Sequence, residues 1–225
     1  MQQLDIETAW GRLQPLLRAP FGSFASPDTM TLMRRNKGRA GQLLEVAIGS
    51  SQGSRLLDFV DGDLKTYKCD PLGRPRETMA IHQVGGEVDD LVRRTQFKDT
   101  ALHVKTKRLI VAGVCKDSSD PAAWYVACAS LVDGRPGTDW YEQFSRSYGE
   151  ILEHFHVHIS RGDMMFHTSQ GEYIQLRTKD SAPYRPLVST VLRRTMCDKN
   201  VAFYFKKRFM EELNSRQSGR GSTSL

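Results

Sequence analysis

The stretch LLDFVDGDLKTYKCD, residues 56–70, decides how the rest of the chain is interpreted. The Asp-Gly dipeptide at 61–62 is the kind that forms the two-residue turn of a β-hairpin. Asp58 would end the first strand, and Asp63 and Lys65 would point to one face of the second. Two carboxylates and a lysine in the pattern D…(D/E)-x-K are the groups that a magnesium-dependent nuclease needs. The alternative interpretation is a solvated turn with charged flanks.

A third carboxylate, Glu45, interrupts the apolar run LLEVAI in a short helix expected over residues 38–48. A buried carboxylate is costly unless it is paired or bound to a metal, although one at the edge of the helix would reach solvent. Together with Asp58 and Asp63 it would supply three oxygen donors, which suit Mg²⁺. Lys65 would then orient the attacking water or stabilise charge on the phosphate.

The composition favours a globular protein with an anionic partner. The chain has 225 residues, enough for one large domain or two small ones, and a net charge of +6. That charge favours nucleic acid first and a membrane surface second. The four cysteines are widely spaced and contain no C-x-x-C pair, which argues against a zinc site and fits a reducing cytosol. With no signal peptide and no apolar run of about 20 residues, we expect a cytoplasmic protein that does not enter a membrane.

Apolar periodicity predicts further helices and strands. Helices are expected at residues 4–18, 140–155 and 186–195, and strands at 78–84, 109–115, 124–132 and 201–205. A second hairpin is expected from strands at 164–168 and 172–178. This mixture predicts a mixed α/β fold around one central sheet. Residues 1–213 would form a single domain, followed by a disordered basic tail at 214–225.

Several stretches resemble the MutH family of DNA endonucleases, which includes the mismatch-repair nickase and GATC-cutting type II restriction enzymes. They are KGRAGQLLEVAIGSSQGSRLLDF, DLKTYKCDPLGRPRET, VKTKRL, GEYIQLR and FYFKKRF, in order from about residue 30 to about residue 210. The resemblance implies a restriction-endonuclease-like PD-(D/E)xK fold, with a central mixed sheet flanked by helices. It also implies two lobes around a DNA-binding cleft.

The resemblance assigns roles to individual residues. It implies metal-binding carboxylates at Glu45, Asp58 and Asp63, the catalytic lysine at Lys65, and a further active-site lysine at Lys105. The implied metal is Mg²⁺, with Mn²⁺ able to substitute. Three residues would read or discriminate DNA, namely Lys37, Arg177 and Tyr204, and an aromatic beside adenine could sense a methyl group. Lys206 and Lys207 follow a strand and would meet phosphates.

Two departures from MutH occur in the opening stretch. Asp63 stands where MutH has glutamate, and the loop between Asp58 and Asp63 is two residues shorter. On these grounds we expect a stand-alone type II restriction-type enzyme that cuts double-stranded DNA at a short palindromic, GATC-like site and responds to adenine methylation. With one active site per chain, it would act as a monomer or as a transient dimer on DNA. The alternative is a mismatch-repair nickase that MutL activates to cut the unmethylated strand. A remoter alternative is a non-catalytic DNA-binding module.

Overall fold

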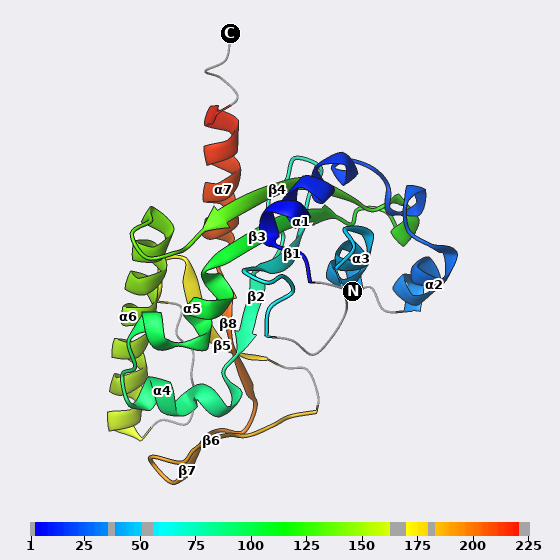
Figure 1. The fold of residues 1–225 in the computed structure, drawn as a ribbon. Coiled ribbons are helices and arrows are strands. Elements are labelled where there is room, and N and C mark those ends of the chain that lie inside the picture. Colours follow the sequence, from blue (N-terminus) through cyan, green and yellow to red (C-terminus); the bar gives the residue numbers. More distant parts are fainter. Residues whose placement is uncertain (1–2, 36–38, 51–55, 163–169, 180–182, 221–225) are drawn as a thin grey trace. The chain divides into compact units, whose positions relative to one another are not determined.

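The computed structural model describes residues 3–35, 39–50, 56–162, 170–179 and 183–220. Within it the chain forms two compact units, each with its own sheet (Figure 1). Unit 1 comprises residues 1–79, 108–133 and 209–225, and unit 2 comprises residues 80–107 and 134–208. The fold is mixed α/β as predicted, but the strands form separate sheets instead of one central sheet.

The sheet of unit 1 has the strand order β1-β3-β4 and is mixed. Its strands are β1 (Asp63–Cys69), β3 (Arg108–Cys115) and β4 (Tyr125–Asp133). β1 runs parallel to β3, with Asp63 opposite Leu109, and β4 runs antiparallel to β3. The continuous apolar sequence of β3 is explained by its central position, because such a strand is covered on both faces.

Helices cover the sheet of unit 1, and α1 and α3 lie beside β3 and β1 (Figure 1). The helices are α1 (Ile6–Leu13), α2 (Pro27–Arg35), α3 (Ala40–Ala47) and α7 (Lys207–Arg220). The apolar faces of α1, α2 and α3 share one core with the sheet, which includes Ile6, Leu13, Leu43, Leu44, Leu64, Ile110, Val114 and Val126. This core anchors β1 and α3, the two elements that carry the predicted metal ligands Asp63 and Glu45.

Unit 2 has a three-stranded sheet in the order β2-β8-β5 and a two-stranded hairpin of β6 and β7. The strands are β2 (Met79–Gln83), β5 (Ile174–Lys179), β6 (Leu187–Ser189), β7 (Arg194–Cys197) and β8 (Asn200–Phe205). The helices are α4 (Val88–Val92), α5 (Ala101–Thr106) and α6 (Asp139–Arg161). The amphipathic face of α6 packs on the sheet, with the rings of Phe144 and Phe205 5.3 Å apart.

The predicted hairpin at residues 56–70 is wrong. Residues 56–62 form no strand, and β1 pairs with β3. A hydrogen bond from Phe59 N–H to Gly62 O (2.9 Å) closes a turn. The carboxylate of Asp61 accepts the N–H of Ile6 (2.8 Å), so the turn is fixed to α1.

The helix predicted at residues 186–195 is also wrong, since this segment is the β6–β7 hairpin. Asp89 of α4 accepts hydrogen bonds from the Ser189 hydroxyl (2.6 Å) and the Thr190 N–H (3.2 Å), which hold the chain in a turn. Branched side chains at 188, 190, 191 and 195 also favour strands over helices. A long-range contact of this kind has no signature within the segment.

Two further predictions concern the ends of elements. Part of the second predicted hairpin, residues 163–169, lies outside the described residues, while its other strand is β5. α7 extends to Arg220 and so includes residues 214–220 of the predicted disordered tail. Asn214 donates to Gly73 O (2.8 Å), and Gln217 donates to Ala129 O, so polar contacts with the sheet region accompany this part of the helix.

Among the helices of the described residues, none is both long enough and apolar enough to cross a membrane.

Candidate active site

Asp63 and Lys65 begin β1 and point to the same face of the strand, as the sequence predicts. Asp63 is fully buried, and its Oδ2 lies 2.6 Å from Nζ of Lys65. Only 17% of the Lys65 side chain is exposed, so both members of the ion pair are largely withdrawn from water. A buried carboxylate needs such a partner, because an isolated charge in the interior is strongly destabilising.

Asp58 lies at the start of the turn, next to Asp63. Its N–H donates to Oδ1 of Asp63 (3.2 Å), and its own Oδ2 accepts the N–H of Leu64 (2.9 Å). Burial, followed by the hydrogen bond with the Asp63 carboxylate and its negative charge, raises the pKa of Asp58 to about 7. The turn thus holds two carboxylates close together, which destabilises the ionised form of Asp58.

Glu45 lies on α3 and is half-buried. Ser50, just after the helix, ties this element to the turn, because its N–H donates to Glu45 O (2.8 Å) and its hydroxyl donates to Asp58 O (3.0 Å). In the part of the chain that the structure describes, however, no three acidic, histidine or cysteine side chains are gathered closely enough to hold a metal ion. The structure therefore brings Asp58, Asp63 and Lys65 together and places Glu45 on a neighbouring element.

The donor set at the turn fits a hard divalent cation. Asp58 and Asp63 offer only oxygen atoms, which Mg²⁺ and Mn²⁺ prefer to nitrogen or sulfur. Burial, and after it the neighbouring Asp63 carboxylate, raises the pKa of Asp58, while Lys65 pairs with Asp63. A bound cation would favour the ionised form of Asp58.

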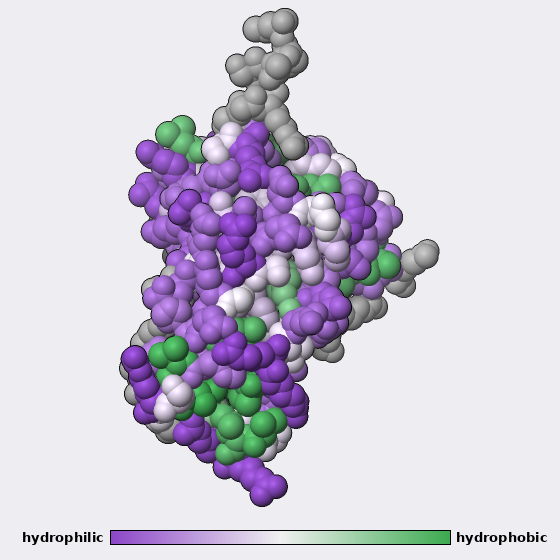
Figure 2. All heavy atoms as spheres, turned by 90° about the vertical axis from the view of Figure 1, so that its left-hand side faces the viewer, coloured by the Kyte–Doolittle hydropathy of each residue, from purple (hydrophilic) through white to green (hydrophobic). Residues whose placement is uncertain are grey.

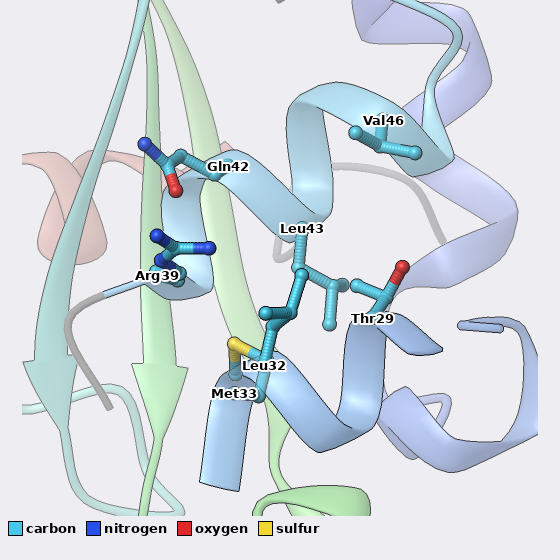
Figure 3. Close-up of a pocket in the computed structure, with 7 residues that line it drawn as sticks. All are labelled: Thr29, Leu32, Met33, Arg39, Gln42, Leu43 and Val46. Atoms are coloured by element: carbon cyan, nitrogen blue, oxygen red, sulfur yellow. The ribbon is translucent and has the colours of Figure 1, made fainter. Parts of the chain in front are cut away.

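A cavity of about 140 Å³ lies between α2 and α3 (Figure 3). Its lining residues are Thr29, Leu32, Met33, Arg39, Gln42, Leu43 and Val46. Figure 3 shows Arg39, just before α3, and Gln42 of α3 extending toward the strands, whereas Leu43 points toward α2. None of the predicted site residues lines this cavity, so the largely apolar hollow is separate from the carboxylates.

Five of the remaining predicted residues lie in unit 2, namely Lys105, Arg177, Tyr204, Lys206 and Lys207. Lys105 is half-buried on α5. Arg177 of β5 and Tyr204 of β8 are neighbours on one face, with the Arg177 guanidinium 5.2 Å from the centre of the Tyr204 ring. This distance is in the range of a cation–π interaction, so the two side chains form one arginine–aromatic pair. Lys206 donates from Nζ to Gly171 O (2.8 Å).

Lys207 and Lys37 are the two other predicted DNA-binding residues. Lys207 is exposed as the first residue of α7 and lies at the end of unit 2. Lys37 lies outside the described residues.

Three residues of the site region were missed by reasoning from the sequence, namely Ser50, Asp61 and Arg108. Ser50 links α3 to Asp58, as described above. Asp61 was seen only as a turn residue, although its carboxylate also accepts a hydrogen bond from Arg108. Arg108 lies in the VKTKRL stretch, in which the resemblance assigns a role only to Lys105. No local signal identifies the roles of Asp61 and Arg108, because they depend on contacts made far along the chain.

Part of the surface of unit 2 is apolar. Figure 2 shows apolar residues gathering over the lower part of one face, where α6 and the β6–β7 hairpin lie in Figure 1. Exposed valines in these elements are Val157, Val188 and Val191, which are 45%, 52% and 42% exposed. Exposed apolar groups of this kind often mark contact surfaces, but they do not belong to the carboxylate site.

Comparisons with known proteins bear on the whole chain. A DNA mismatch repair protein MutH from Shigella flexneri is 27% identical over 223 residues, covering 94% of this chain and 93% of that protein. The protein of the same name from Escherichia coli O127:H6 is 30% identical, covering 88% and 84%. That from Salmonella paratyphi B is 31% identical over 192 residues, covering 82% and 78%. No family model matches the chain.

Proposed function

The chain belongs to the MutH family, and from this premise we propose that it is a DNA endonuclease of mismatch repair. The observation that carries the proposal is the close approach of Asp58 and Asp63, in which the Asp58 N–H donates to the Asp63 carboxylate and Lys65 pairs with Asp63. We assign the chain the restriction-endonuclease-like PD-(D/E)xK fold, in which these residues supply the two acids and the lysine of the motif. The substrate is double-stranded DNA, and the cytoplasmic location stays a prediction.

The repair role replaces the stand-alone restriction role that the sequence favours. The matched relatives span nearly the whole chain and carry the name of a mismatch repair protein. We therefore propose a nickase that cuts the unmethylated strand at a GATC-like site, with MutL as its activating partner. One active site per chain suits this role, because a nick requires only one hydrolytic centre.

Asp58 and Asp63 would hold Mg²⁺ or Mn²⁺, with Glu45 as a third candidate ligand from α3. When bound, the cation lowers the pKa of a water molecule and offsets the negative charge of the phosphate. Lys65 orients the attacking water or stabilises the developing charge through Nζ, which Asp63 holds at 2.6 Å. The Leu64 N–H fixes one oxygen of Asp58, so the carboxylate keeps its orientation when substrate binds.

Recognition of the DNA site falls to residues of unit 2. The guanidinium of Arg177 suits hydrogen bonds to the edge of guanine, and its stacking on Tyr204 restricts its orientation. The Tyr204 ring would lie beside adenine and sense a methyl group. Lys206 and Lys207 would contact phosphates, together with Lys37, whereas Lys105 would approach the reacting phosphate.

Cleavage of supercoiled plasmid tests the proposal. The purified protein is incubated with Mg²⁺ and with unmethylated, hemimethylated or fully methylated plasmid, each with and without MutL. We expect weak nicking of the first two substrates that rises sharply with MutL. Linear product at discrete sites without MutL would instead support the restriction role.

Substitutions separate catalysis from binding. Asp58→Ala should abolish nicking, whereas Asp117→Ala, at an exposed carboxylate of the same unit, should leave it unchanged. If Asp58→Ala nicks as well as the unaltered protein, the assignment of the active site is wrong. DNA binding without cleavage at any concentration of Mg²⁺ or Mn²⁺ would support the non-catalytic alternative.

A further inference from the structure

The N-terminal segment, residues 3–7, lies along the turn that carries the candidate metal ligands. Near the start of the turn, the Gln3 side chain donates to Leu57 O (3.1 Å). Farther along, the Val60 N–H donates to Leu4 O (2.9 Å). Contacts therefore join this segment to the start and the middle of the turn, although the segment contributes nothing to the motif itself.

Asp61 is the centre of these contacts. One of its oxygens accepts the N–H of Ile6 (2.8 Å) at the start of α1, and the other accepts Nη1 of Arg108. Arg108 is 14% exposed and begins β3, the strand that pairs with β1. Because the two groups come from different elements, Asp61 fixes the turn to both α1 and the central strand.

Close packing leaves the turn little freedom to move. A Cβ atom at Gly62 would lie 2.9 Å from Arg108 O and would also strike the side chain of Ile6. The backbone of the turn thus approaches α1 and β3 as closely as a glycine permits. The second ion pair of Arg108, with Glu7, lies at the surface, where 63% of the Glu7 side chain is exposed.

From these contacts we propose that Asp61 and Arg108 are positioning residues, which hold the turn so that Asp58 and Asp63 stay together. This inference rests on the proposed function, in which the two carboxylates bind the metal. Asp58 and Asp63 repel each other when both are ionised, so an unrestrained turn would let them separate. Asp61 restrains this separation through its two partners, because its oxygens accept hydrogen bonds from Ile6 and Arg108.

A matched pair of substitutions tests the proposal. Asp61→Asn removes the charge that faces Arg108 but keeps an oxygen for the Ile6 N–H, whereas Glu7→Gln makes the same change at the exposed partner of Arg108. Two quantities are measured: the Mg²⁺ concentration for half-maximal nicking, and the affinity for Mn²⁺ from electron paramagnetic resonance without cleavage. Residues that orient metal ligands typically change such affinities by about 10–100-fold. We expect a change of that size for Asp61→Asn and values near those of the unaltered protein for Glu7→Gln.

Thermal denaturation and DNA binding in EDTA are measured on the same proteins. The proposal expects DNA binding without metal to be preserved in Asp61→Asn. It is overturned if this variant keeps the normal Mn²⁺ affinity and Mg²⁺ dependence, or if Glu7→Gln shifts both equally. If Asp61→Asn does not fold, Arg108→Gln removes the same ion pair and is judged by the same criteria. If the unaltered protein itself neither binds Mn²⁺ nor nicks DNA, the proposed function fails, which is a distinct result.

Discussion

Asp58→Asn should make the protein more stable at pH 8 while abolishing its nuclease activity. The substitution keeps the shape of the side chain and removes a charge that burial and Asp63 disfavour. Because the folded state holds the proton of Asp58 more tightly than the unfolded chain does, unfolding releases that proton. The ionised carboxylate therefore lowers the free energy of unfolding as the pH rises from about 4 through about 7.

The size of this effect follows from the pKa of Asp58. A rise from 3.8 to about 7 corresponds to roughly 4 kcal/mol above pH 7, at about 1.36 kcal/mol for each pH unit. Asp58 is only partly buried, so solvent screening reduces this to on the order of 1–2 kcal/mol. For a chain of this length, a gain of about 1 kcal/mol raises the melting temperature by about 2–4 °C.

Thermal denaturation of both proteins between pH 4 and pH 8, in EDTA, measures the effect. The difference in melting temperature should be small near pH 4, grow through the neutral range and favour Asp58→Asn. Adding Mg²⁺ at pH 8 should raise the melting temperature of the unaltered protein and leave that of the variant unchanged. A difference that does not vary with pH would refute the claim that Asp63 and burial disfavour the Asp58 charge.

Three other changes probe separate parts of the molecule. Lys65→Ala should slow nicking by about 10²–10³-fold, as measured by plasmid cleavage, while DNA binding in EDTA persists; an unchanged rate would exclude Lys65 from catalysis. Gly62→Ala should destabilise the protein by about 1–3 kcal/mol in thermal or urea denaturation because its Cβ meets Arg108 O, and Gly86→Ala, with open space around it, is the control. Arg177→Ala should cost about 1–3 kcal/mol of discrimination against altered sites in competition binding, and equal loss on all sequences would indicate a phosphate contact instead.

The fold was predictable where apolar pattern and local chemistry agree. The central strand β3, the strands β2, β4 and β8, and the long helix α6 all lie where periodicity places them. Prediction failed where a distant side chain decides the local structure. Asp89 holds residues 189–191 in a turn from about a hundred residues away, which overrides the helical spacing of that segment.

The candidate site was predictable in part. Spacing alone places Asp63 and Lys65 on one face of a strand, and the structure confirms that placement. The contact of Asp58 with Asp63 arises from a turn rather than the predicted hairpin. The sequence therefore predicts that the two residues are neighbours, but it predicts the wrong secondary structure around them. The network around Asp61 could not be foreseen, because it joins residue 61 to residues 6 and 108.

The two departures from MutH do not separate the restriction role from the repair role. Aspartate at position 63 has a shorter reach than glutamate, yet its carboxylate meets both Nζ of Lys65 and the N–H of Asp58. The Phe59–Gly62 hydrogen bond closes the turn, and Asp58 and Asp63 are in contact although both the side chain and the loop are shorter. Because these two differences leave the candidate site intact, they do not favour the restriction role over the repair role. The response of nicking to MutL distinguishes the two roles.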